Sequence, residues 1–486
     1  MRAATLVGSL LAATLAVTAT ATSTPYNNLQ WIQSEIDFIA QLQARLMGSP
    51  EHNILIDHIE SELKQIGLPV YEDTIEFSYS DPPVIQPVLE VDGQNIQLSG
   101  WIPYSGTNSS SATGKLVNVV TPNITATPNW AAAKDAIALA NLTNVALDFN
   151  TEFGAWSLSA PWPAQPGIPS FSATEFTNLV AAAVAGVRGV VYIWDNITAG
   201  LADNQYVPFQ QANLAIPGVY VQSDSVISHL LDAADSGTDA FIDLPGKRVP
   251  NTRSRTLYTI VNGTDLTLRN ETAIINTHTD GVNAVVQNGH IALLDYARGL
   301  KANPPRRTII LVFVAGHMHY GELVAAPGRA TDLWLRAHPE LWNGTQHAVF
   351  GSCVEDMGAV QFVEDLAKGT YTPTGGVEPE LLFAATAPLA ALTQRLWSGA
   401  EPNITRIVNP NNVTGKLAQP GEGLPLLNAG IPEVSLVTTP AYLTKIYDRG
   451  FDERTLVNTM ALVRQVASFE RLWSAVDEMS AEDLRQ

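Results

Sequence analysis

From residue 256 to the end of the chain, compact apolar runs alternate with stretches in which apolar residues recur every three or four positions. The stretch 271–278 predicts a strand, and the run 307–314 is rich in Ile, Val and Leu, which is typical of a strand that is buried on both faces. The stretches 289–302 and 388–399 have the spacing of amphipathic helices. Strands that alternate with helices in this way predict a layered α/β domain with a largely parallel sheet.

The first part of the chain predicts a helix over 29–46, a second helix that starts within 48–52 and ends at Gly67, and a strand over 70–79. Between 82 and 255 the pattern changes, because Pro, Gly, Ser, Thr and Asn become dense and the apolar runs become short. This region indicates a β-rich insertion with a few helices. We therefore expect one α/β domain built from 24–81 and 256–486, interrupted by an inserted domain over 82–255.

The first 23 residues have one Arg, then a short apolar run, then small residues, which is the pattern of a secretory signal peptide. No later stretch offers the unbroken apolar length of a membrane span, so we expect a secreted, extracellular protein that leaves the membrane after signal cleavage. Sequons for N-glycosylation agree with this route. They begin at Asn108, Asn123, Asn141, Asn196, Asn262, Asn270, Asn343, Asn403 and Asn412.

The composition narrows the class of partner. The formal net charge is −20, and no basic run interrupts it, so the surface repels nucleic acid and anionic lipid. Cys353 is the one cysteine, which excludes an intramolecular disulfide and is typical of a small buried side chain.

Polar side chains follow two of the predicted strands. His278 and Asp280 follow the first strand, and His317 and His319 follow the next. Residues two positions apart on a strand point to the same face, and ligands of open α/β sheets gather at the carboxyl ends of the strands. Imidazole and carboxylate suit zinc. The alternative interpretation is that these side chains only cap strand ends and bond to the backbone.

The order of the motifs resembles that of the secreted di-zinc aminopeptidases, the family that also includes glutamate carboxypeptidase, the transferrin receptor and the glutaminyl cyclases. The resemblance rests on "INTHTDG", "NGHIALLDYARGL", "RRTIILVFVAG", "EDMG" and "LPLLNAGIPEVSLVTT", in the family's order. The segments "AGVRGVVYIWD" and "IPGVYVQ" look like the protease-associated domain that many members carry. The resemblance implies a three-layer zinc-exopeptidase-like α/β domain with a mixed, largely parallel sheet, plus an inserted β-rich protease-associated domain.

The resemblance also assigns residues. His278 matches the family's first zinc ligand, and Asp280 matches the carboxylate that orients it. Asp356, or Glu355 before it, matches a later acidic ligand. His319 is a further candidate ligand at the second strand end.

Three positions depart from the family's pattern. The bridging Asp is expected near Val285, the paired Glu are replaced by His317 and Met318, and the C-terminal His is replaced by Leu443. Two zinc ions close together need a bridging anion, and water activation needs a carboxylate base, so the usual di-zinc mechanism is not expected.

Two interpretations stay open. In one, the protein is a metal-dependent, peptidase-like hydrolase with a single zinc, in which His317 takes the place of the catalytic base and the substrate is a peptide or a small molecule. In the other, it is a non-catalytic relative that binds a ligand or a partner protein.

Overall fold

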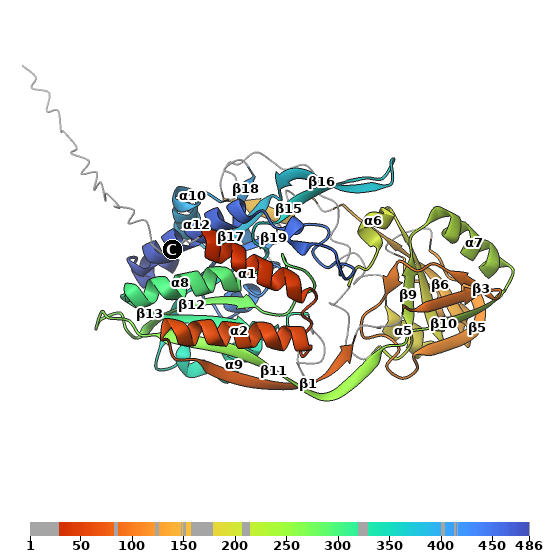
Figure 1. The fold of residues 1–486 in the computed structure, drawn as a ribbon, viewed down its shortest axis with the longest axis horizontal. Helices are drawn as coiled ribbons and strands as arrows, with labels where there is room; N and C mark the ends of the chain where they lie inside the picture. Colours follow the sequence, from red (N-terminus) through yellow and green to blue (C-terminus); the bar gives the residue numbers. More distant parts are fainter. Residues whose placement is uncertain are drawn as a thin grey trace, which may run out of the picture.

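The computed structural model describes most of the chain after the leader. The described residues are 29–81, 86–121, 126–146, 148, 152–156, 178–206, 214–318, 329–399, 404–412, 415 and 417–485. The expected signal peptide and the candidate ligand His319 lie outside the described residues. Figure 1 shows two lobes side by side, one with helices packed on a sheet and one dominated by strands.

The larger lobe is built on a five-stranded sheet in the order β1-β11-β13-β12-β14. Strands β13, β12 and β14 are parallel, whereas β11 pairs antiparallel with both β13 and β1. The bounds are β1 (Tyr71–Asp81), β11 (Lys247–Val261), β12 (Glu271–His278), β13 (Thr308–Val314) and β14 (His347–Cys353).

A second group of four strands extends the same layer, in the order β19-β17-β18-β7. Two parallel bridges, Gly351 to Glu433 and Val354 to Leu436, join its strand β19 to β14. The bounds are β7 (Phe153–Ala155), β17 (Glu380–Ala384), β18 (Thr405–Asn412) and β19 (Val434–Thr438). The sheet is therefore mixed: the pairs around β12 and the pair of β17 with β18 are parallel, whereas the outermost pair at each edge is antiparallel.

Helices cover both faces of this sheet. On β13, Ile309, Leu311 and Phe313 pack into the core under one helical layer, whereas Ile310 and Val312 pack into the core under the other. Because both faces are buried, the strand reads as a continuous apolar run. The first layer contains α1 (Leu29–Leu42), α2 (Pro50–Ile66), α8 (His290–Ala302), α10 (Ala387–Leu396) and α12 (Thr459–Asp477), and the second contains α9 (Ala330–Ala337) and α11 (Leu424–Asn428). The predicted three-layer α/β class is confirmed.

The ends of α2 show why the sequence forms this helix where it does. Ser49 accepts a hydrogen bond from the backbone N–H of His52, and Pro50 occupies the first helical turn. Gly67 ends the helix with φ of 82°, a left-handed conformation that suits glycine. The predicted bounds of this helix are confirmed.

The smaller lobe, called here the β-rich lobe, comprises the described residues of 88–243 apart from 148 and 152–156. Its eight strands are ordered β3-β2-β10-β5-β6-β8-β9-β4. They are β2 (Val88–Val91), β3 (Gln94–Ile96), β4 (Gly100–Trp101), β5 (Ser111–Asn118), β6 (Ile137–Thr143), β8 (Gly189–Asp195), β9 (Gly218–Val221) and β10 (Asp239–Asp243). Helices α5 (Leu179–Val184), α6 (Ala199–Ala202) and α7 (Asp224–Asp235) accompany them.

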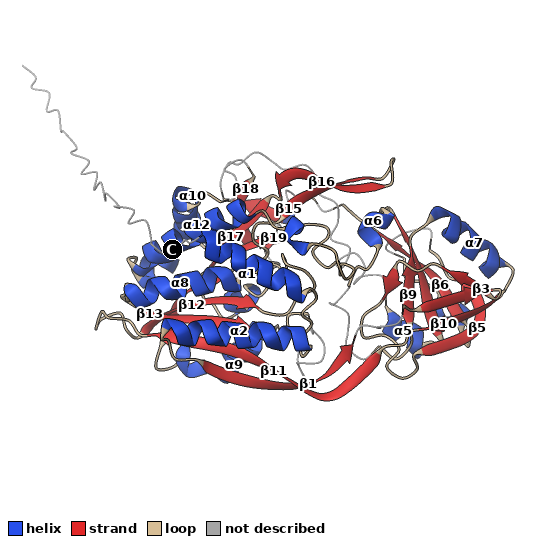
Figure 2. Cartoon of the chain, in the orientation of Figure 1, coloured by secondary structure: helices blue, strands red, loops and turns tan. Residues whose placement is uncertain are grey.

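The hairpin of β15 (Val360–Asp365) and β16 (Thr370–Val377) was not expected from the sequence, and it projects from the larger lobe (Figure 2). Glu364 on this hairpin accepts a hydrogen bond from the backbone N–H of Thr198, beside α6. The hairpin therefore contributes to the contact between the two lobes.

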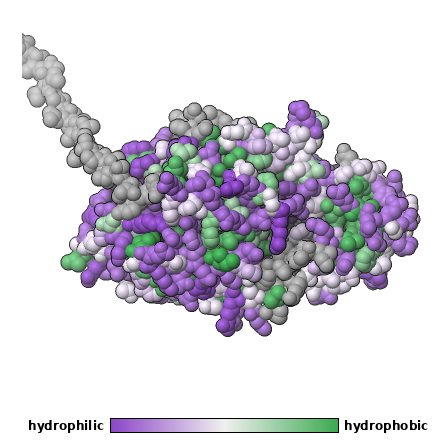
Figure 3. Space-filling model, in the orientation of Figure 1, coloured by the Kyte–Doolittle hydropathy of each residue, from purple (hydrophilic) through white to green (hydrophobic). Residues whose placement is uncertain are grey.

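The surface seen in Figure 3 is mostly hydrophilic, and apolar residues appear on it in small separate groups. Among the residues that the structure describes, none of the helices combines the length and the apolarity that a bilayer span requires.

Candidate metal centre

Three adjacent parallel strands bring the candidate ligands together. In the sheet register His278 pairs with Val314, and Asn276 pairs with Cys353, so β12, β13 and β14 end side by side. His278 ends β12, His317 follows β13 and Glu355 follows β14. The potential ligand atoms of these three residues all lie within 4.8 Å of one another. All three side chains are buried. Within the described part of the chain this is the one such group of three.

The ring of His278 is fixed at both ends. Its Nδ1 lies 2.8 Å from the backbone oxygen of Asp280, and its Nε2 lies 3.9 Å from Oε1 of Glu355. The ring stacks on that of His317 with 4.1 Å between centroids. When Nδ1–H donates to the carbonyl, Nε2 keeps its lone pair toward the centre of the group, which is how metal-binding histidines are oriented.

Glu422 connects the other two members of the group. Its Oε1 lies 2.8 Å from Nδ1 of His317, and its backbone N–H donates to Oε1 of Glu355 over 2.8 Å. Its Oε2 accepts a hydrogen bond from the backbone N–H of Thr331. Because Nδ1 of His317 is bonded to Glu422, Nε2 is the nitrogen that can coordinate a metal while this hydrogen bond is kept.

Sequence reasoning missed Glu422. It precedes the Gly-Ile-Pro segment that carries the resemblance, in "PGEGLPLL", and it lies far along the chain from both residues that it contacts. A glutamate between two glycines gives no periodic signal, so only the long-range pairing of β14 with β19 shows its place.

Asp280 plays two separate parts. Its backbone oxygen accepts the hydrogen bond of His278, whereas its carboxylate accepts from the backbone N–H groups of Gly316, His317 and Met318. The carboxylate is fully buried. It therefore fixes the turn that carries His317, and the orientation of His278 depends on the backbone of Asp280.

Glu355 lies against a glycine. A Cβ atom at Gly421, where φ is +76°, would be 2.1 Å from Oε2 of Glu355. The thiol of Cys353 donates to Oε1 of the same carboxylate over 3.2 Å. Cys353 is buried and forms no disulfide, as predicted. The segment around Gly421 thus holds the carboxylate toward the histidines.

Asp356 stands apart from the group that His278, His317 and Glu355 form. Its backbone has φ of 56°, and its carbonyl accepts a hydrogen bond from the hydroxyl of Thr438. Burial, and then the charge of Glu355, raise the pKa of Asp356 well above its usual range. Of the five candidate residues that the structure describes, it brings three together, places Asp280 beside them and separates Asp356.

The electrostatics of the group shift the pKa values of its two imidazoles in opposite directions. Burial and the charge of His317 lower the pKa of His278. Burial opposes the charged form of His317, but the hydrogen bond and the charge of Glu422 outweigh it and raise that pKa. In turn, His317 lowers the pKa of Glu422 to about 2 against the opposing effect of burial.

Two of the amides near the position where a bridging Asp is expected have structural partners, whereas the buried side chain of Gln287 has no hydrogen-bond partner among the described residues. Asn283 donates to the carbonyls of Tyr442, Leu443 and Lys445. Asn288 donates to the carbonyl of Met357 and accepts from its N–H. These side chains tie loops together, and they bring no carboxylate to the group.

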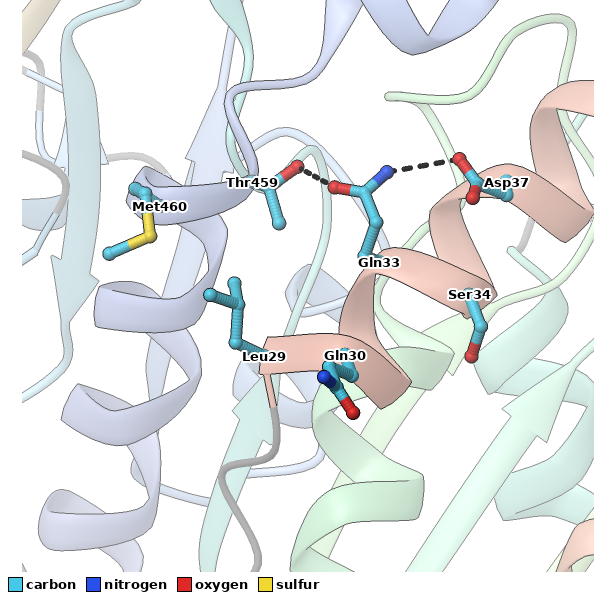
Figure 4. Close-up of a pocket in the computed structure, with 7 residues that line it drawn as sticks. All are labelled: Leu29, Gln30, Gln33, Ser34, Asp37, Thr459 and Met460. Carbon is cyan, nitrogen blue, oxygen red and sulfur yellow. Dashed lines mark hydrogen bonds between the residues drawn. The ribbon is translucent and has the colours of Figure 1, made fainter.

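A surface hollow of about 500 Å³ lies away from this centre, between the first turns of α1 and α12 (Figure 4). Gln33 crosses it, accepting from Thr459 and donating to Asp37. The other residues at its edge are Leu29, Gln30, Ser34 and Met460. With one carboxylate and no histidine in its lining, the hollow offers no comparable chemistry.

No family model matches the sequence, and no curated protein sequence matches it. Solved structures do match. A zinc aminopeptidase from Bacillus subtilis is 13% identical, with a TM-score of 0.62 over 95% of this chain and 98% of its own. A peptidase precursor from Shewanella amazonensis is 17% identical, with a TM-score of 0.62 over 93% and 95%. An aminopeptidase from Aneurinibacillus is 14% identical, with a TM-score of 0.59 over 92% and 93%. These matches confirm the predicted zinc-exopeptidase fold.

Proposed function

We propose that this chain is an aminopeptidase-like hydrolase that holds a single zinc ion through His278, His317 and Glu355. The observation that carries the proposal is the convergence of these three side chains at the carboxyl ends of three adjacent strands. Two imidazoles and one carboxylate are a donor set that catalytic zinc uses, with a further position for water or substrate.

The surroundings of the three residues fit a metal. A metal-bound histidine usually donates its other ring N–H to a carbonyl or a carboxylate, and here His278 has the carbonyl of Asp280 and His317 has Glu422. Glycine at 421 leaves room for the carboxylate of Glu355. The donors are therefore oriented before a metal arrives, which lowers the entropy that binding has to overcome.

The proposal differs from the di-zinc pattern of the family. A second zinc would need a bridging carboxylate, and the positions near Val285 supply only amides, of which Asn283 and Asn288 are engaged with backbone groups. If His317 binds through Nε2, its Nδ1 hydrogen bond to Glu422 leaves no nitrogen to take a proton. In this proposal His317 is therefore a ligand rather than the catalytic base.

Zinc at such a centre supplies Lewis acidity, which polarises a carbonyl and lowers the pKa of water. The chain's own residues supply orientation. Glu422 keeps the proton on Nδ1 of His317, and Asp280 holds the turn that carries this ring. Burial of the three donors limits competition from bulk water.

We further propose an extracellular location, with residues 1–23 as a cleaved signal peptide and the β-rich lobe, which lies within the predicted insertion over 82–255, as a protease-associated domain. Five sequon residues are exposed, which suits glycosylation: Asn108, Asn196, Asn262, Asn270 and Asn343. The substrate class that follows from the aminopeptidase fold is a peptide with a free N-terminus.

The test is turnover of aminoacyl p-nitroanilides and dipeptides by the zinc-loaded chain. We expect hydrolysis that a strong chelator abolishes, that added zinc restores and that His278→Ala removes. His347→Ala is the matched control, since His347 is exposed at the start of β14. Turnover that survives chelation, or no turnover on the whole panel, would contradict the proposal; the second result would favour the non-catalytic alternative.

A further inference from the structure

The peptide that follows His317 is held from both lobes. On one side, the N–H of Met318 donates to Oδ2 of Asp280 over 2.7 Å. On the other side, the carbonyl of Met318 accepts a hydrogen bond of 2.5 Å from the hydroxyl of Tyr104, which belongs to the β-rich lobe. Both Met318 and Tyr104 are buried. The residue next to a candidate zinc ligand therefore has each of its backbone polar groups fixed by a different lobe.

Tyr104 is itself positioned by a second tyrosine. The hydroxyl of Tyr206 donates to that of Tyr104 over 2.8 Å, and the two rings pack edge to face with 6.1 Å between centroids. Burial, together with the charge of Asp280, raises the pKa of Tyr206 well above its usual value, although the bond to Tyr104 opposes this. The hydrogen bonds therefore run in series, from Tyr206 to Tyr104 and from Tyr104 to the carbonyl of Met318.

The segment that carries Tyr206 is attached to the larger lobe. The N–H of Tyr206 donates to the carbonyl of Thr444 over 2.7 Å, and the N–H of Ile446 donates to the carbonyl of Asn204 over 2.9 Å. The side chain of Gln205 accepts from the hydroxyl of Thr444. This short antiparallel pairing fixes the tyrosine pair relative to the sheet that carries the metal centre.

The backbone of Tyr104 indicates that this arrangement is imposed by its surroundings. Its φ is 62°, in the left-handed region that a bulky side chain rarely adopts. Such a conformation is unfavourable for a bulky residue and persists where neighbouring contacts determine it. Here the contacts include the apolar cluster formed with Met47, Val286 and Met318 across the two lobes.

We propose that the β-rich lobe is a positioning element of the metal centre, and that Tyr104 and Tyr206 hold the His317–Met318 turn in the geometry that metal binding needs. The inference rests on the proposed function only in taking His317 as a ligand. The role of the β-rich lobe is then to position the His317–Met318 turn. A lobe that only bound substrate or enlarged the fold would not affect metal binding.

The test measures zinc affinity and not turnover. Tyr104→Phe and Tyr206→Phe remove one hydroxyl each and keep the rings, so the apolar contacts persist. We expect zinc affinity, measured by competition with a chromogenic chelator, to fall about tenfold in Tyr104→Phe, the range typical of groups that orient a ligand. The visible absorption of the cobalt(II)-loaded protein should change in shape, because the position of His317 changes.

Tyr192→Phe is the matched control. Tyr192, on β8, is also fully buried in the β-rich lobe, and it packs in the apolar cluster of Trp194 and Tyr220 rather than in the one that Tyr104 and Tyr206 share with Met318. We expect its zinc affinity and cobalt spectrum to match those of the unmodified chain.

The outcomes separate this inference from the proposed function. Unchanged zinc affinity and cobalt spectrum in Tyr104→Phe would overturn the inference and leave the metal centre standing. An equal loss in Tyr192→Phe would also overturn it, because the loss would then come from the stability of the lobe. Failure of the unmodified chain to bind zinc would overturn the proposed function first.

Discussion

Oε1 of Glu422 lies 2.8 Å from Nδ1 of His317, at the meeting point of two segments 105 residues apart in the sequence. The same glutamate donates its backbone N–H to Glu355, so one residue orients two of the three proposed ligands. This arrangement makes Glu422 the residue on which the geometry of the centre depends most.

Glu422→Gln keeps the size of the side chain and removes its charge. We expect zinc affinity to fall about 10- to 100-fold, because an amide is a weaker acceptor for the N–H of His317 and does not stabilise positive charge on the ring. Competition with a chelator measures the change.

Glu380→Gln is the control for this substitution. Glu380 is likewise fully buried in the larger lobe and hydrogen-bonded, to Gln465, Trp397 and Thr405, and it is not part of the centre. Its zinc affinity should be unchanged. A loss of the same size in both variants would show that buried charge in general, and not the bond to His317, sets the affinity.

Gly421→Ala tests the space that Glu355 occupies. The new Cβ would lie 2.1 Å from Oε2 of Glu355, so the carboxylate has to move and zinc binding should be lost. Gly430→Ala is the matched control, since both glycines have φ of +76°. At Gly430, however, no atom lies within 4 Å of the position that the new Cβ would take. Gly430→Ala should cost about 1–2 kcal/mol of unfolding free energy and leave zinc affinity intact. Equal zinc affinity in the two variants would contradict the placement of Glu355.

Buried carboxyl groups predict that stability is greatest in mild acid. Burial raises the pKa of Glu378 to about 8, and burial with the charge of Glu470 raises that of Asp295 to about 8. A raised pKa means that the folded state binds protons more tightly, so this stability is present below the ordinary pKa and is lost as the pH rises toward 8. The pKa of Glu35 is shifted in the opposite direction. Burial alone would raise this pKa, but hydrogen bonds to His290 and His58 outweigh burial and lower it to about 2. Its contribution is lost as the pH falls below about 4.

Glu378→Gln isolates one of these groups. The amide resembles the protonated carboxyl, so the variant should be more stable than the unmodified chain at pH 8, by about 1–3 kcal/mol, and equal to it near pH 4. Urea unfolding at the two pH values measures this. Glu90→Gln, at a half-buried position on β2, is the control for the loss of a glutamate charge outside the core. A variant that gains no stability at pH 8 would contradict the assignment of Glu378.

The sequence predicted the sheet and its helices well because their signals are local. The apolar run 308–314 is continuous since the strand is buried on both faces, and α2 begins and ends at the residues whose capping chemistry is visible in the sequence. The hairpin β15–β16 was missed because its residues are largely exposed or half-buried and show no regular alternation.

The site was only partly accessible to the same reasoning. His278 and His317 stand at strand ends, so their meeting follows from parallel pairing. The choice between Glu355 and Asp356 depends on the left-handed turn at Asp356, which turns its backbone away from the strand direction. The parts of Glu422 and Tyr104 arise from contacts between distant segments, and no local pattern encodes such contacts.

The central claim is a single metal ion at His278, His317 and Glu355. The most direct measurement is the zinc content per chain by inductively coupled plasma mass spectrometry, after zinc loading at neutral pH and removal of excess metal. We predict about one equivalent in the unmodified chain and none in His278→Ala, with His347→Ala unchanged. Two equivalents, no bound zinc, or one equivalent retained in His278→Ala would contradict the account.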